Sequence, residues 1–279
     1  MKKIAITAIF TLIVLSSSSF AISSGRLRHF SFATYAINHY QYDWAGSMLW
    51  GIPTADSLRD AVVANIDLKN AIHISSGGAP TSVSTYAFND NDVTESSFLS
   101  SSAAYYNFVY YYGHGNTNLI TMWNYNGYVY NNHPGIGVRN TYWVWLNSCL
   151  VFRNGYSDQE PWFDGMFKGA HSILGESSLS FGSYYTLKAA QDFASRWIFY
   201  DEKIWEAYYL SIFYYTHLQG GFDIEPKIVY RYGYINGVFF DPWEERFNQV
   251  YRGPIFYNND YDGIGSRWIT LGTPSYGSN

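Results

Sequence analysis

The amino-acid sequence predicts an α/β fold: a three-layer sandwich with a mainly parallel sheet, followed by a β-rich C-terminal extension. Three short apolar and aromatic runs end abruptly in small polar residues, which is typical of strands buried on both faces of a parallel sheet. Segments in which apolar residues recur at helical spacing lie before and after these runs. Strands and helices in this arrangement favour a parallel sheet covered by helices.

The first predicted strand spans residues 30–37, and the helix after it spans residues 57–66 because apolar residues recur on one face. A second, short helix is predicted near Thr94, with Thr94 or Asp92 as its cap. The remaining predicted elements are strands at residues 107–112, 142–146, 170–174, 228–234 and 238–240, helices at residues 186–197 and 203–215, and a hairpin turn at Asn126-Gly127.

The N-terminus resembles an export signal. Lys2 and Lys3 precede an apolar run over residues 4–15, and Ser19 and Ala21 are small residues suited to signal-peptidase cleavage. The run is too short to cross a bilayer as a helix, and no later stretch is apolar for long enough. We therefore expect a signal peptide at residues 1–21, an α/β domain at 22–220 and a β-rich extension at 221–279. The predicted protein is secreted or periplasmic, without a transmembrane anchor.

Composition excludes one class of partner and leaves another open. The formal net charge is -5 and no cluster of Lys and Arg forms a basic stripe, so we expect no nucleic-acid partner. The chain contains 28 Tyr, 10 Trp and 19 Phe residues. Aromatic surfaces of this kind also occur on glycan binders and adhesins, so a binding protein remains an alternative.

The chain has a single cysteine, Cys149. Exported proteins normally use thiols in pairs, and one thiol cannot form an intramolecular disulfide. A lone thiol in such a chain is a small buried hydrophobe, an intermolecular link or a reactive group.

His114 and Cys149 each follow one of the predicted buried strands. Side chains at the carboxyl ends of parallel strands leave the packed faces while the strands hold them rigidly, so ligands gather there. A thiol of ordinary pKa, near 8.5, needs a neighbouring imidazole to act as a nucleophile at neutral pH. Neighbouring strands lie about 4.8 Å apart, which can bring the two side chains within reach of one another.

The pattern resembles the caspase, gingipain, legumain and clostripain clan of cysteine peptidases. In those enzymes a hydrophobic strand ends in His-Gly and a later one ends in the catalytic Cys. Here the strands read FVYYYGHG, ending in His114-Gly115, and YWVWLNSC, ending in Cys149, with the His and Cys 35 residues apart, similar to gingipain-like members. The strand before Ser177 matches a third hydrophobic strand near the specificity pocket. Ser148 departs from the clan, since several members have Gln or Ala there.

This resemblance implies a caspase-like fold and a peptidase that acts on a peptide or protein substrate. It assigns His114 as general base or ion-pair partner and Cys149 as nucleophile. The backbone N–H groups of Gly115 and Cys149 would hold the oxyanion. The alternative is an exported, aromatic-rich binding or surface protein on the same scaffold, without catalysis.

Other residues are weaker candidates. Glu176, Ser177 and Asp164 are placed to line a pocket for a basic substrate side chain, although carboxylates in loops are more often simply solvated. His171 lies inside an apolar run. We expect it to be a buried, hydrogen-bonded core residue, or a residue that contacts the site residues without touching the substrate.

A calcium loop is the one cofactor site with some support. Asn258, Asp260 and Asp262 place oxygen ligands at alternate positions before a glycine, but the twelfth position is Ile269 instead of Glu. The sequence contains neither a His-Glu-x-x-His zinc motif nor a glycine-rich phosphate loop with Lys. We therefore expect no cofactor apart from this possible calcium ion.

Overall fold

The computed structural model describes residues 24–42, 47–99, 106–124, 127–133, 141–153, 161–167, 170–179, 182–221, 224–235, 238–251 and 265–270. The strands are β1 (Ser24–Gly25), β2 (His29–Ala36), β3 (Ser82–Asn89), β4 (Phe108–Tyr112), β5 (Gly115–Asn116), β6 (Leu119–Thr121), β7 (Tyr128–Tyr130), β8 (Trp143–Asn147), β9 (Ser172–Glu176), β10 (Pro226–Ile235), β11 (Val238–Phe240), β12 (Val250–Tyr251) and β13 (Gly265–Thr270). The helices are α2 (Gly51–Ser75), α3 (Glu95–Ser97), α5 (Tyr184–Ala194) and α6 (Ile204–Ile212), with π-helical η5 (Trp162–Met166), η6 (Ser195–Phe199) and η7 (Phe213–Gln219) and 3-10 turns η2 (Asp90–Asp92) and η8 (Pro242–Glu244).

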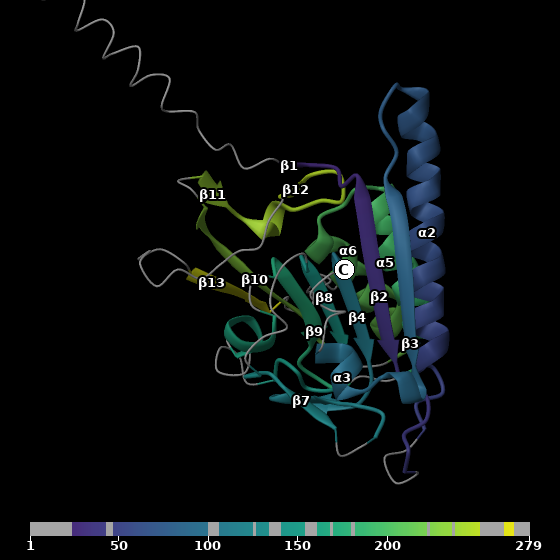
Figure 1. Ribbon diagram of the computed structural model, residues 1–279, viewed down its shortest axis with the longest axis vertical. Helices are drawn as coiled ribbons and strands as arrows, with labels where there is room; N and C mark the ends of the chain where they lie inside the picture. The colour runs from purple at the N-terminus through teal and green to yellow at the C-terminus, as the bar shows by residue number, and fades with distance from the viewer. Residues whose placement is uncertain are drawn as a thin grey trace, which may run out of the picture.

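The main sheet has the strand order β11-β10-β9-β8-β4-β2-β3. Strands β3, β2, β4, β8 and β9 are parallel, whereas β10 runs antiparallel to β9 and also pairs with β13. In Figure 1 the parallel strands point toward the end of the molecule where α3 and β7 lie. The prediction of an α/β sandwich with a mainly parallel sheet is therefore confirmed. Beyond residue 220, β10 is hydrogen-bonded directly into this sheet.

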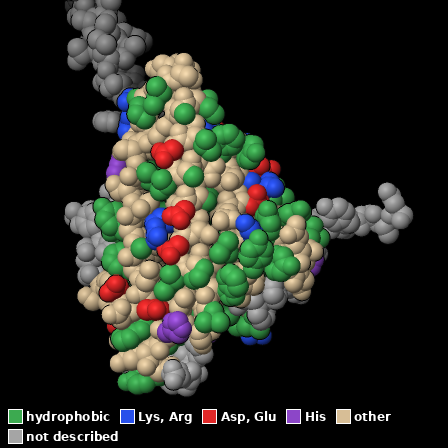
Figure 2. Space-filling view, turned by 90° about the vertical axis from the view of Figure 1, so that its right-hand side faces the viewer, with side chains coloured by type: hydrophobic (Ala, Val, Ile, Leu, Met, Phe, Trp, Pro, Cys, Tyr) green, Lys and Arg blue, Asp and Glu red, His purple; other side chains and the backbone are tan. Residues whose placement is uncertain are grey.

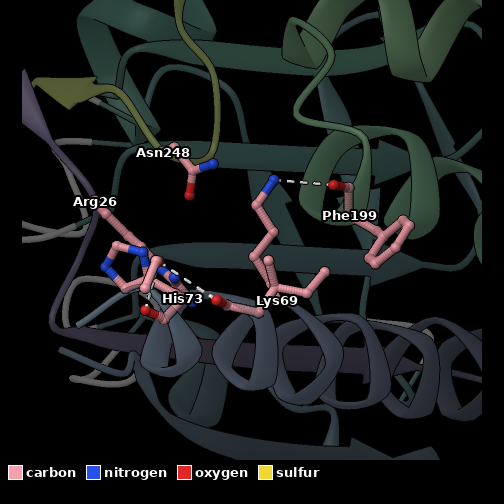
Figure 3. Close-up of a pocket in the computed structure, with 7 residues that line it drawn as sticks. Arg26, Lys69, His73, Phe199 and Asn248 are labelled. Carbon is pink, nitrogen blue, oxygen red and sulfur yellow. Dashed lines mark hydrogen bonds between the residues drawn. The ribbon is translucent and has the colours of Figure 1, made fainter. Parts of the chain in front are cut away.

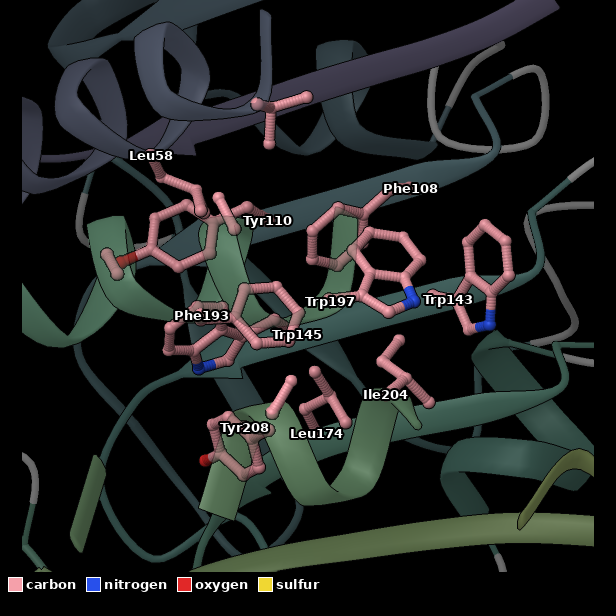
Figure 4. Close-up of a cluster of buried hydrophobic side chains, with 14 of the residues drawn as sticks. Leu58, Phe108, Tyr110, Trp143, Trp145, Leu174, Phe193, Trp197, Ile204 and Tyr208 are labelled. Atoms are coloured by element: carbon pink, nitrogen blue, oxygen red, sulfur yellow. The ribbon is translucent and has the colours of Figure 1, made fainter. Parts of the chain in front are cut away.

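One face of the sheet is covered by α2, α5 and α6. Side chains from these helices pack against alternate residues of the central strands in a single aromatic-rich core (Figure 4). Trp143 and Trp197 meet edge to face with ring centroids 4.8 Å apart, and Trp145 meets Tyr208 in the same way at 5.2 Å. Such pairs add about 0.5–1.5 kcal/mol beyond the burial of their area.

The other face of the sheet is covered by shorter elements. On this face the other set of alternate strand residues packs against side chains from the α3 region, from η5 and from the small antiparallel sheet β5-β6-β7. Every residue of β4, β8 and β9 is buried because both faces are covered. This double burial is why these strands appear in the sequence as unbroken apolar runs.

Several elements differ from the prediction for physical reasons. Helix α2 extends far beyond residues 57–66, but its buried residues end at Ile66. Its last turns therefore lack the regularly spaced apolar residues from which a helix is predicted. Strand β3 was not predicted, because it is an edge strand with a polar, partly exposed sequence. Strand β9 begins two residues later than predicted, where Ser172 pairs with Trp143 of β8. Helix α3 is only one turn, with Thr94 as its predicted cap.

The face of the molecule on the side of α2 carries hydrophobic side chains in scattered groups among polar ones, and charged groups of both signs lie in small separate clusters (Figure 2). The predicted signal peptide and Asn126 lie outside the described residues. Within the part of the chain that the structure describes, no helix is both long enough and apolar enough to cross a membrane.

A buried polar cluster closes the amino-terminal end of the central strands. The fully buried carboxylate of Glu245 accepts hydrogen bonds from Trp143 Nε1 at 2.8 Å and His171 Nδ1 at 2.9 Å. His171 also stacks on Tyr142, with ring centroids 4.7 Å apart. His171 is thus a buried, hydrogen-bonded core residue, and it lies at the opposite end of the sheet from His114.

We predict that Glu245→Ala lowers the free energy of unfolding by about 3–5 kcal/mol, because it leaves two buried donors without their acceptor. Glu245→Gln should cost less, since an amide oxygen can still accept one hydrogen bond. Urea unfolding followed by circular dichroism measures both. The matched control is Glu244→Ala, which removes a surface ion pair with Lys203 and should change stability by less than about 1 kcal/mol. Equal losses for Glu244→Ala and Glu245→Ala would contradict this role.

Candidate functional site

The carboxyl ends of β4 and β8 bring the two predicted catalytic residues to the same edge of the sheet. The strands are parallel, with Tyr112 of β4 opposite Asn147 of β8. The pairing continues one step further, where the N–H of Gly113 donates to the carbonyl of Asn147 at 3.4 Å. His114 and Cys149 each lie two residues beyond the Tyr112–Asn147 pair, and both are half-buried.

The position of this edge within the sheet is also favourable for a ligand. The chain passes from β2 outward to β3, then returns to form β4 on the other side of β2. The carboxyl edge between β2 and β4 is therefore a topological switch point, the place where ligands of open α/β sheets bind. His114 follows one of these two strands, and Tyr40 comes shortly after the other.

Tyr40 holds the backbone and the ring of His114. Its hydroxyl oxygen accepts a hydrogen bond from the N–H of His114 at 2.6 Å, and the two rings stack with centroids 5.1 Å apart and 16° between their planes. Tyr111 acts on the other side of the same residue, with its hydroxyl 2.5 Å from the carbonyl oxygen of Thr121 and 3.1 Å from that of His114. Two buried phenols thus fix the turn that presents His114.

The charge of Cys149 acts on these same phenols. Burial raises the pKa of Tyr40, Tyr111 and Tyr112 well above the ordinary value, and the charge of Cys149 adds to the rise in all three. The raised pKa values keep the three phenols neutral, so that they remain hydrogen-bond donors.

The backbone turns sharply directly after Cys149. Leu150 has φ of 60°, a left-handed conformation that is uncommon for a residue other than glycine. Two hydrogen bonds hold this turn against the segment at the end of β9: the N–H of Leu150 donates to the carbonyl of Ser178 at 2.9 Å, and that of Phe152 to the carbonyl of Glu176 at 3.1 Å. Unfavourable backbone conformations of this kind persist where surrounding contacts fix them, and they cluster at functional sites.

Gly115 packs directly against the residue before Cys149. A Cβ atom at Gly115 would overlap the hydroxyl of Ser148 and would lie 2.9 Å from the carbonyl oxygen of Leu119. Ser148 is itself fully buried. The resemblance assigned the backbone N–H of Gly115 to the oxyanion, and the contact that requires a glycine here is with the turn that carries Cys149.

Glu176 is buried within the site region and is not a solvated loop carboxylate. It is the last residue of β9, with 1% of its surface exposed. Its charge contributes to the raised pKa of Tyr110, Tyr112 and Tyr208, after the larger effect of burial in each case. Glu176 lies two residues after Leu174 in β9, so its side chain points to the same helix-covered face as Leu174, where the buried tyrosines lie.

The other predicted pocket residues are placed less centrally. Ser177 is buried, and its hydroxyl donates to Glu225 Oε2 at 2.6 Å. Asp164 belongs to η5, and its side chain lies outside the described residues, as do Asn258, Asp260 and Asp262 of the possible calcium loop. Among the side chains that are described, no group of three or more His, Cys, Asp or Glu is arranged to hold a metal ion.

Sequence reasoning missed Tyr40 and the other tyrosines of the site. In the sequence, Tyr111 and Tyr112 stand out only as members of an apolar run. Tyr40 comes three residues after the predicted end of the first strand, and the rule that strand ends share one edge of a parallel sheet could have singled it out.

No protein-family model matches this chain, and a comparison with characterised proteins finds no match to it either. The chemistry of this edge of the sheet is therefore inferred from its own residues and their geometry.

Proposed function

We propose that the protein is an exported cysteine peptidase, secreted or periplasmic, that hydrolyses an amide bond of a peptide or protein with Cys149 as nucleophile and His114 as its proton-transfer partner. On this proposal the α/β sandwich is a caspase-like catalytic domain and residues 221–279 are its β-rich C-terminal extension. The proposal uses neither a metal nor an organic cofactor.

One observation carries the proposal. His114 and Cys149 follow two adjacent parallel strands at matching positions, and Gly115 packs against Ser148, so the two turns that carry them are in contact. A cysteine that only filled the core would need no half-exposed position at the carboxyl edge of the sheet. The left-handed Leu150 and the phenols around His114 fix both turns, as a reaction between positioned groups requires.

The reaction follows from these two side chains. The imidazole of His114 accepts the thiol proton, and the sulfur of Cys149 attacks the carbonyl carbon of the substrate amide. The carbonyl oxygen becomes an oxyanion, to which the backbone N–H groups of Gly115 and Cys149 are assigned as donors. When the C–N bond breaks, the imidazolium returns the proton to the leaving amine. Water then attacks the thioester, which releases the acid and restores the thiol.

We predict that iodoacetamide labels Cys149 in the folded protein near neutral pH faster than it labels free cysteine, because an adjacent imidazole favours the thiolate. Mass spectrometry of the alkylated chain measures the rate. His114→Ala should slow the labelling, whereas His39→Ala should not, because His39 is an exposed histidine at the same end of the sheet that pairs with Asp90. Labelling that appears only after denaturation would favour the binding-protein alternative.

We predict that Cys149→Ala and His114→Ala each reduce hydrolysis of susceptible peptides by at least about a thousandfold, and that the double variant is no worse than either single one. Groups that act as one unit lose most of their effect when one is removed. A panel of peptide substrates gives the rates, circular dichroism checks the fold and His39→Ala is the matched control. Undiminished turnover by folded Cys149→Ala protein would overturn the proposed mechanism.

Tyr40 is predicted to be a positioning residue. Tyr40→Phe keeps the ring that stacks on His114 but removes the acceptor of its backbone N–H, so we expect kcat to fall about tenfold with KM little changed. The limb of the pH–rate profile that reports the histidine should shift as well, which a purely structural role would not cause. Tyr42→Phe is the control, because that exposed tyrosine lies two residues further along. A Tyr40→Phe enzyme with an unchanged profile and rate would exclude this role.

A further inference from the structure

A cavity lies at the opposite end of the sheet from His114 and Cys149. Its volume is about 400 Å³, within the range of about 300–1,000 Å³ that is usual for small-molecule sites. It lies between the segment that leads into β2, the last turns of α2, the end of η6 and the segment before β12 (Figure 3). The lining residues are Arg26, Lys69, Ile72, His73, Ser76, Phe199 and Asn248.

Two cations in this cavity are held in place by the protein itself. Arg26 donates from Nε to Thr81 Oγ1 at 2.7 Å and from Nη2 to Asn70 Oδ1 at 2.5 Å. Lys69 reaches across the cavity from α2 and donates one N–H to the carbonyl of Phe199 at 2.9 Å (Figure 3). An ammonium carries three N–H donors, and this bond, which orients Lys69, uses one of them. The cations are therefore positioned before any ligand arrives.

The charges in and around the cavity do not cancel. Burial lowers the pKa of Arg26 and of Lys69, and repulsion from Arg26 lowers the pKa of Lys69 further. Asp201 acts in the opposite direction on both, so one carboxylate faces two cations. The Asp201 carboxylate also accepts the N–H of Asn248 at 2.9 Å. Arg246 also donates to the backbone carbonyl of Asp201, so cations outnumber this one carboxylate and the surroundings favour an anionic ligand.

The remaining walls add two apolar side chains and three polar ones, His73, Ser76 and Asn248. Ile72 and Phe199 contribute apolar side chains. The side chain of Asn248 points into the cavity, and its Oδ1 atom is buried without a hydrogen-bond partner among the described residues (Figure 3). A carboxamide can either donate or accept, and a buried polar atom of this kind is normally satisfied by a partner.

We propose that this cavity binds a small monocarboxylate with an apolar body, its carboxylate at Arg26 and Lys69 and its hydrocarbon portion against Ile72 and Phe199. Such a ligand matches the two cations, the apolar side chains and the volume together. The site is separate from the proposed catalytic edge, so its occupancy is measured independently of hydrolysis.

The test uses the full chain and sodium hexanoate as the probe, with isothermal titration calorimetry and thermal melting at constant ionic strength. Hexanoate should bind and raise the melting temperature, because a ligand of the folded state stabilises it. Acetate should bind more weakly for lack of an apolar body, and neutral hexanamide more weakly for lack of charge. Inorganic phosphate tests the other anion class.

Two variants locate the site. Lys69→Gln should raise the Kd for hexanoate about tenfold or more, since it removes a charge-assisted hydrogen bond. Ile72→Ser should weaken hexanoate but leave acetate unchanged. The matched control is Lys188→Gln, which removes a lysine on α5 that bonds to Gln191, outside the cavity. Absence of hexanoate binding, equal binding of hexanamide, binding of phosphate in preference to hexanoate, or an unchanged Kd in Lys69→Gln would each overturn the proposal.

Discussion

Strands β4 and β8 are hydrogen-bonded in parallel along their whole length, and this pairing determines where the chemistry of the protein can occur. Parallel strands with a common register end at the same edge, so residues that follow them emerge side by side. Both strands are fully buried, and the layers on their two faces prevent them from slipping. A shift of one residue would turn Trp145 and Tyr110 toward the wrong core and would separate His114 from Cys149.

The abundance of aromatic residues has a structural explanation in this fold. Many of the largest side chains are fully buried in the two cores, where their rings meet edge to face or stacked. Near the carboxyl edge of the sheet the same residue type contributes its hydroxyl. Tyr40 and Tyr111 bind the backbone on either side of His114, and an aliphatic core residue could not do both tasks. Composition alone suggested an aromatic binding surface, whereas much of this content serves packing and positioning.

The two ends of the sheet differ in their electrostatics. The carboxyl end brings neutral phenols around an imidazole and a thiol, with the buried Glu176 nearby. The amino-terminal end contains the buried pair of His171 and Glu245 and, further out, the cavity with its two cations. Helix α2 connects these ends, because it begins beside β4 at Gly51 and its last turn lines the cavity.

The sequence alone determined the mainly parallel sheet, most of its strands and the placement of His114 and Cys149 after two of them, because burial on both faces produces apolar runs that are visible locally. Only the tertiary structure decided which residues surround that pair. Tyr40 lies 74 residues before His114, and the two meet because β2 pairs with β4. Glu176 appeared to be a loop carboxylate until the register of β9 against β8 placed it inside the sheet. The cavity at Arg26 is lined by segments that are far apart in the sequence. Strand order and helix packing bring these segments together, and a local sequence pattern cannot predict that.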